Sequence, residues 1–78
     1  MSTRSVLETI LQEIVQHPSQ LKLTELTGEK TTIFELRCHA KDVGKVIGKN
    51  GKTVGAVRNL VGVLAARDGK KAVLEIVE

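Results

Sequence analysis

The stretch Val46-Ile47-Gly48-Lys49-Asn50-Gly51-Lys52-Thr53-Val54 holds two glycines, three residues apart, between two segments with helical spacing. Glycine permits a tight turn with positive φ, and its missing side chain lets another backbone approach closely. Lys49 and Lys52 add positive charge beside the start of the second segment, where free amides and the helix dipole already favour an anion. The stretch therefore predicts two helices joined by a loop, Gly48-Lys49-Asn50-Gly51, that cradles phosphate groups.

A nucleotide-binding P-loop is one alternative for this loop, because Gly51-Lys52-Thr53 has the letters that end such a motif. A P-loop needs a further glycine five residues before Gly51, where this sequence has Val46, and it follows a strand rather than a helix. Both differences argue against an NTPase. A plain turn between helices that simply needs glycine is the second alternative, since two glycines at this spacing often occur by chance.

The pattern of apolar residues around the loop predicts three helices and three strands. Helices are expected at residues 5–16, 41–47 and 52–66, and strands at residues 21–24, 31–38 and 72–77. A Ser5–Glu8 capping box is expected to start the first helix, and Pro18 to stop it after His17. The order α-β-β-α-α-β predicts a two-layer α+β domain in which three helices pack on a three-stranded sheet. The last strand is expected to pair beside an earlier strand.

The core must be built almost entirely from aliphatic side chains, because Phe34 is the only aromatic residue and 41% of the chain is hydrophobic. The residues expected to face the core are Val54, Val57, Val61 and Leu64 on the last helix and Phe34, Leu36 and Cys38 on the second strand. Proteins that stack bases on aromatic platforms need several exposed aromatic residues. If this chain binds nucleic acid, it must therefore hold bases on aliphatic surface and the backbone by charge.

Positive charge is concentrated in the middle of the chain. The whole chain has a net charge of +3, whereas residues 37–58 contain six basic residues and a single acidic one, Asp42, for a local charge of +5. Such clustering is typical of proteins that bind polyanions. On charge alone, a solvated basic face without a partner is an equal alternative.

A secreted, membrane-bound or metal-binding protein is not expected. Cys38 is the only cysteine, so no disulfide forms within the chain, and residues 1–4 lead into an amphipathic segment without a signal-peptide core. No apolar run approaches the roughly 20 residues that span a membrane. These features predict a cytoplasmic protein that has no contact with membranes.

The adjacent pair Cys38-His39 has the residue types of a metal ligand set or a catalytic nucleophile. A zinc site needs about four ligands at recognisable spacing, and the only other histidine, His17, is distant in sequence. Cys38 is therefore expected to be a core residue. With no paired carboxylates and no nucleophile–base set, the chain is expected to be neither an enzyme nor the binder of a cofactor or a small-molecule substrate.

The run Val46-Ile47-Gly48-x-x-Gly51-x-x-Val54-x-x-Val57, the basic loop and the element order together resemble the KH family of RNA-binding domains, in the type II arrangement found in bacteria. The resemblance covers nearly the whole chain and implies one KH domain over residues 1–78. Val43-Gly44-Lys45-Val46-Ile47-Gly48 and Val73-Leu74-Glu75-Ile76 are similar to the small bacterial KhpA-like group within that family.

The resemblance implies a site in which the glycine loop clamps about four nucleotides of a single strand. The helices beside the loop and one strand edge would form an aliphatic groove for the bases. The implied RNA-binding residues are Gly48, Lys49, Asn50, Gly51, Lys52, Lys45, Ile47, Val54, Gly55, Arg58 and Arg37, with Val43 and Gly44 as further groove candidates.

Several of these assignments have a second interpretation. Gly55 costs stability in the middle of a helix, and either room for a base or tight packing of the helix on the sheet would explain it. Arg58 is expected to reach the edge of a strand. Arg37 and Lys45 could do the same, but they are equally well explained as surface charges.

The expected function is a non-catalytic single-stranded RNA-binding protein, acting as an RNA chaperone or post-transcriptional regulator. RNA and single-stranded DNA are not distinguished by the sequence. The alternative is a protein-interaction module, as a homodimer or as a heterodimer with a larger KH-containing protein. The end of the last helix has small residues that would let a partner helix approach closely: Gly62, Ala65 and Ala66. Packing of this helix on the protein's own sheet explains them better.

Overall fold

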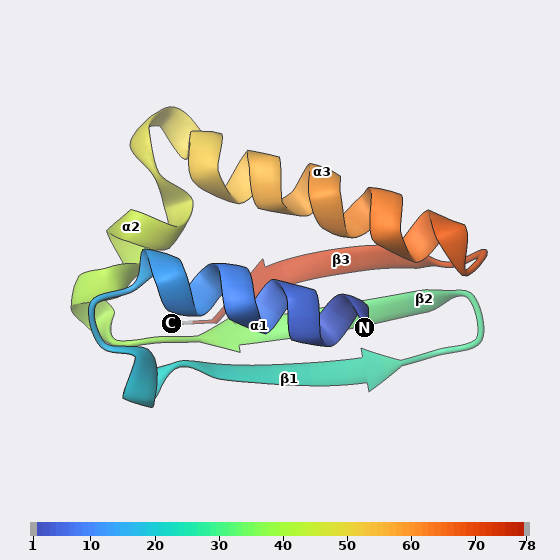
Figure 1. Ribbon diagram of the computed structural model, residues 1–78, viewed down its shortest axis with the longest axis horizontal. Coiled ribbons are helices and arrows are strands. Elements are labelled where there is room, and N and C mark those ends of the chain that lie inside the picture. The colour runs from blue at the N-terminus through green and yellow to red at the C-terminus, as the bar shows by residue number, and fades with distance from the viewer. Residues whose placement is uncertain (1, 78) are drawn as a thin grey trace.

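The computed structural model describes residues 2–77 and shows three helices lying on a three-stranded sheet (Figure 1). The main elements are α1 (Thr3–Ile14), β1 (Lys22–Thr27), β2 (Thr31–Arg37), α2 (Val43–Ile47), α3 (Lys52–Arg67) and β3 (Lys71–Ile76). Three short 3₁₀ turns connect them: η1 (Pro18–Gln20), η2 (Ala40–Asp42) and η3 (Lys49–Gly51). The predicted order α-β-β-α-α-β is confirmed.

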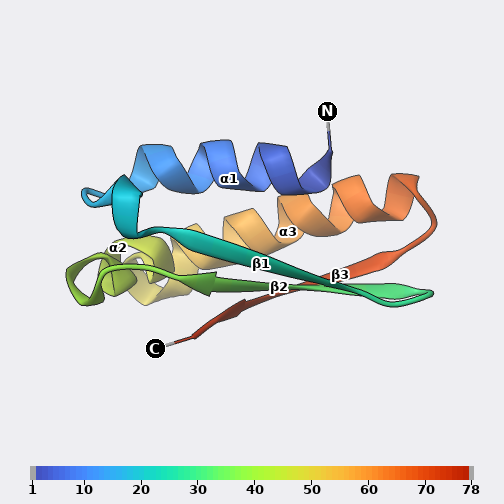
Figure 2. The ribbon, with the colours of Figure 1, turned by 90° about the horizontal axis from the view of Figure 1, so that it is seen from below.

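The sheet has the strand order β1-β2-β3. β1 and β2 form an antiparallel hairpin with Leu23 opposite Leu36, while β3 runs parallel to β2 with Leu74 opposite Phe34. The last strand therefore pairs beside an earlier strand, as predicted. α1 and α3 lie over one face of the sheet, α2 lies at the end of the sheet, and the other face is left uncovered (Figure 2).

The core lies between this face of the sheet and the helices. Its buried apolar residues are Leu7, Leu11, Val15, Leu23, Phe34, Leu36, Val46, Val54, Val57, Val61 and Leu74. On α3 the predicted stripe needs one correction, because Ala65 is buried at its end and Leu64 is only half-buried. Burial of Ala65 also shows that the small residues of this helix serve packing within the domain, at least at that position.

The start of α1 differs from the prediction. The helix begins at Thr3 with Ser2 as its N-cap, and Ser2 and Ser5 form a reciprocal capping box in which each hydroxyl accepts the other's backbone N–H, at 3.1 and 3.2 Å. The Ser5–Glu8 box is therefore wrong. Glu8 instead accepts a 2.9 Å bond from Arg4, one turn earlier.

The end of α1 is also earlier than predicted. The last helical residue is Ile14, and the backbone N–H of Val15 closes the helix on the Leu11 carbonyl at 3.2 Å. Pro18 does not stop the helix directly but starts the turn η1. The chain leaves the helix early because the amides of Gln16 and His17 bind a side chain from another element, described below.

Candidate nucleic-acid interface

The loop between α2 and α3 has the left-handed backbone that its glycines predict. The φ angles are 77° at Gly48, 57° at Asn50 and 72° at Gly51. Asn50 is the only residue other than glycine with positive φ among the described residues 2–77, and asparagine tolerates this region better than most residues. The loop thus turns the chain sharply between two helices at one end of the molecule (Figure 1).

The two glycines of the loop differ in the space around them. A Cβ atom on Gly48 would collide with the hydroxyl of Thr53 and lie 2.8 Å from its backbone nitrogen. A Cβ atom on Gly51 would meet nothing within 4 Å. Gly48 is therefore needed for the loop to close on the start of α3, while Gly51 leaves an open face that another backbone can approach.

The start of α3 presents positive potential at this open face. Gly51 is its N-cap and supplies no side-chain hydrogen bond, and the first turn contains no acidic residue. The N–H of Gly51 bonds to the Gly48 carbonyl at 3.1 Å, which fixes the loop shape. The lysine side chains around this turn, Lys45, Lys49 and Lys52, are all exposed. Together these groups favour an anion outside the loop.

Beside the loop, apolar and small residues provide an open surface on α2 and α3. Ile47 is 37% exposed, Val43 is half-buried, and added Cβ atoms on Gly44 and Gly55 would meet nothing within 4 Å. The open space at Gly55 rules out tight packing as the reason for this glycine. Val54 was predicted in the groove but is 6% exposed and belongs to the core, so it supports the surface from beneath.

Arg58 connects α3 to the free edge of β3, as predicted. The backbone N–H groups of Lys71 and Val77 bond to carbonyls on the β2 side, at 2.8 Å each. Because backbone groups alternate in direction along a strand, those of Ala72, Leu74 and Ile76 point to the open edge. The guanidinium of Arg58 donates from Nε to the Leu74 carbonyl there, at 3.2 Å.

Arg37 is not brought to this surface. On β2, Phe34 and Leu36 face the helices, so Arg37 points to the uncovered face of the sheet, opposite Lys22 on β1. Its predicted contact with the same nucleic acid strand thus receives no support from its position.

A buried carboxylate holds the base of α2. Asp42 is 0% exposed and accepts the backbone N–H groups of Gln16 and His17, at 3.1 and 2.9 Å. Its Oδ2 also lies 3.0 Å from Nδ1 of the His17 ring, which stacks on the ring of His39 at a centroid distance of 4.1 Å. These contacts connect the segment after α1 to the turn η2, which leads into α2 and the loop.

This environment sets the charge of Asp42 and of a neighbouring thiol. Burial alone would raise the pKa of Asp42, but hydrogen bonds from the Gln16 and His17 backbone and from the His17 ring outweigh burial and lower it. Burial and the charge of Asp42 both raise the pKa of the Cys38 thiol, which is half-buried against the core. Asp42 is therefore ionised and Cys38 protonated at neutral pH.

The sequence does not predict this cluster. His17 is distant from Cys38-His39 along the chain, yet the two histidines are in contact in the structure. One signal could have found it, because Asp42 is the only acidic residue within the basic segment 37–58. Among residues 2–77, no group of three potential ligands is placed to hold a metal ion.

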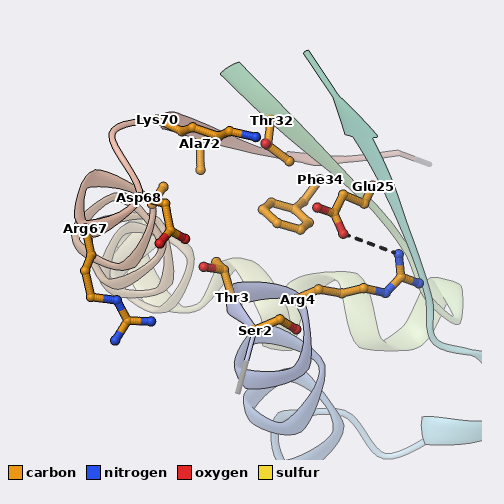
Figure 3. A pocket seen from close by; sticks show the side chains of 11 residues that line it. Ser2, Thr3, Arg4, Glu25, Thr32, Phe34, Arg67, Asp68, Lys70 and Ala72 are labelled. Atoms are coloured by element: carbon orange, nitrogen blue, oxygen red, sulfur yellow. Dashed lines mark ion pairs between the residues drawn. The ribbon is translucent and has the colours of Figure 1, made fainter. Parts of the chain in front are cut away.

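A pocket of about 290 Å³ lies at the far end of the helices from the loop (Figure 3). Phe34, Thr32 and Ala72 from the sheet line it, and Arg4 forms an ion pair with Glu25 on one side, at 3.9 Å. The carboxylates of Glu25 and Asp68 also line the pocket. Arg4, Arg67 and Lys70 line it as well, so the pocket has charges of both signs, unlike the loop, where the exposed charges are lysines.

The element order, the mixed sheet and the glycine loop between two helices define a KH domain of the type II arrangement. Comparison with known families matches residues 4–76 to the KhpA/KhpB KH domain. The chain belongs to this family, which is non-catalytic. Within residues 2–77, no helix is long and apolar enough to cross a membrane.

Similar curated proteins cover nearly the same length. The chain is 38% identical to the RNA-binding protein KhpA of Clostridium acetobutylicum over 95% of this chain and 99% of the relative. It is 37% identical to that of Aquifex aeolicus, over 96% and 95% of the two chains. It is 40% identical to that of Borreliella burgdorferi, over 94% and 89%.

Proposed function

We propose that this chain binds single-stranded RNA and clamps its backbone with the loop Gly48–Gly51. The observation that carries the proposal is the open, left-handed loop at the uncapped start of α3, with Lys49 and Lys52 exposed beside it. Relatives of nearly the same length bear the name RNA-binding protein, which supports RNA as the ligand.

The bases would lie beside the loop on the surface formed by α2, α3 and the free edge of β3. Ile47 offers aliphatic contact, and the open space at Gly55 leaves room for a flat ring. The outward backbone groups of β3 offer hydrogen bonds, and the guanidinium of Arg58 lies at the Leu74 carbonyl on this edge. Backbone clamping of this kind reads little sequence, which suits an RNA chaperone or post-transcriptional regulator in the cytoplasm.

The test is RNA binding by wild type and by the double variant Lys49→Asp/Asn50→Asp, measured by fluorescence anisotropy across salt concentrations. Aspartate tolerates the left-handed region much as asparagine does, so the variant should fold. Its carboxylates should repel phosphate and weaken binding by about tenfold or more. In wild type, contacts to a few phosphates should lower affinity with salt, with a log–log slope of about −0.7 per phosphate contact.

A control variant separates loop contacts from net charge. Gln12→Asp/Lys30→Asp makes the same change in charge at exposed positions on α1 and in the hairpin. We expect it to bind RNA nearly as well as wild type. Equal loss in both double variants, or no loss in either, would contradict the loop clamp. A competing single-stranded DNA of the same length tests whether RNA is preferred.

A second activity, association with another protein chain, is favoured by the outer side of α3. Leu60 is 43% exposed and Val63 is 69% exposed, one turn apart on a helix whose opposite side is in the core. We propose that these residues bind a second KH domain, either another copy or that of a larger KH-containing protein. Two linked RNA sites would compensate for the few contacts that one site makes.

A further inference from the structure

The only two histidines of the chain lie together at the base of the helix that carries the loop. Their rings are nearly parallel, with an interplanar angle of 16° and a centroid distance of 4.1 Å. His17 follows α1, whereas His39 is the N-cap of η2, the turn that runs directly into α2. α2 has five residues, so this turn is only about 7 Å from the loop along the helix axis.

The hydrogen bonds assign different protonation requirements to the two rings. Nδ1 of His17 lies 3.0 Å from the ionised Asp42 and donates to it, which is compatible with a neutral or a charged ring. Nδ1 of His39 accepts the backbone N–H of Lys41 at 3.0 Å, so it must carry no proton. The structure is therefore built for a neutral His39.

Protonation of His39 would undo this arrangement in two ways. A proton on Nδ1 would face the Lys41 N–H and remove the cap of η2. It would also place a positive charge against the stacked ring of His17, which already donates to the Asp42 carboxylate. Asp42 contacts the pair through the His17 ring, and its charge in turn raises the pKa of the Cys38 thiol.

We propose that the His17–His39 pair is a pH-sensitive positioning device for the RNA loop: neutral His39 holds η2 and α2 in place, and its protonation releases them and weakens RNA binding. The proposal rests on the proposed function of the loop. Histidine is the side chain whose unperturbed charge change falls nearest to neutral pH, which makes it the common pH-sensitive group of proteins.

The direction of the effect distinguishes this device from ordinary electrostatics. Added positive charge on two histidines would by itself strengthen binding of a polyanion as pH falls. The positioning device predicts the opposite, a loss of up to about fivefold between about pH 8 and pH 5.5, because affinity cannot fall by more than the stabilisation that a typical N-cap supplies. Oligouridine is the probe, because uracil does not titrate in this range.

The experiment compares wild type with His39→Asn, which keeps an oxygen acceptor for the Lys41 N–H but does not titrate in this range. Wild type should lose affinity on acidification, whereas His39→Asn should keep, when acidified, the affinity that it has itself at pH 8. Parallel pH profiles for the two proteins, or tighter binding of wild type at low pH, would overturn the proposal.

A measurement without RNA keeps the device testable if the variant folds poorly. In an NMR titration of wild type, the amide signals of Lys41, Gly48 and Gly51 should shift together with the His39 ring, and independence of these signals would refute the coupling. The loop variant Lys49→Asp/Asn50→Asp at pH 8 tests the clamp separately. If that variant still binds RNA, the clamp fails; if it does not bind but wild type shows no acid loss, only the device fails.

Discussion

At the scale of single residues, the four glycines near the proposed site are not equivalent. Gly48 is required by backbone angle and by contact with Thr53, while Gly51 is required by backbone angle alone. Gly44 and Gly55 lie in helices with free space where a side chain would be. Glycine inside a helix costs stability, and packing within the domain does not require it at these two positions, so contact with RNA is the explanation to test.

The variant Gly55→Ala tests whether Gly55 leaves room for an RNA base. Gly62→Ala is a matched control on the same helix. Both positions have open space around an added Cβ, so both variants should unfold at higher urea concentration, with a gain of about 0.5–1 kcal/mol. Only Gly55→Ala should weaken RNA binding, by about threefold or more, because only Gly55 adjoins the loop. Equal RNA affinity in both variants would remove Gly55 from the groove.

At the scale of elements, the sequence predicted the helices, strands and their order because apolar periodicity is a local property. It also predicted the loop, since the glycines and lysines that shape it are adjacent in sequence. It could not predict the hydrogen bonds and the ring contact that join the end of α1 to the start of α2. The residues that make them come together only in the folded chain: Gln16, His17, His39 and Asp42. Arg37 is a different case, because the alternation that places Phe34 and Leu36 on the core face already places Arg37 on the opposite face of the sheet.

The hydrogen bonds that Asp42 accepts should make the free energy of unfolding depend on pH in the acid range. The folded-state pKa of Asp42 is lowered below the unfolded value of about 3.9. Its carboxylate therefore stabilises the fold at higher pH, and this contribution is lost as pH falls through the folded-state pKa. In urea unfolding, the difference between wild type and Asp42→Asn should be constant near neutral pH and shrink below about pH 4.

Asp68→Asn is the control for this measurement, since Asp68 is exposed and no hydrogen bond to its side chain is recorded in residues 2–77. Its effect on unfolding should be small at every pH. A difference for Asp42→Asn that stays unchanged from pH 7 to pH 3 would mean that the carboxylate does not titrate differently in the folded and unfolded chains.

At the scale of the whole molecule, the two proposed activities lie on different surfaces. RNA would occupy the end of the molecule with the α2–α3 loop, and a protein partner the exposed side of α3. Val63→Asp should weaken self-association by about tenfold or more in analytical ultracentrifugation, because it places a charge in an apolar contact. Binding of one short RNA at low salt should change little.

Val73→Asp is the matched control for the association test. Val73 is 43% exposed on the uncovered face of the sheet, so it carries a similar apolar side chain away from α3. Self-association should survive this change. Loss of association in Val73→Asp but not in Val63→Asp would move the partner surface from the helix to the sheet.

Arg58 has a consequence for the behaviour of the protein at high concentration. An unpaired strand edge is a template on which other chains can add strands and aggregate. The free edge of β3 lies beside the proposed RNA groove and so must stay accessible. By holding the Leu74 carbonyl with a charged side chain, Arg58 interrupts the row of free acceptors at its middle. The edge can then remain open to an RNA base while it discourages the growth of a fibril.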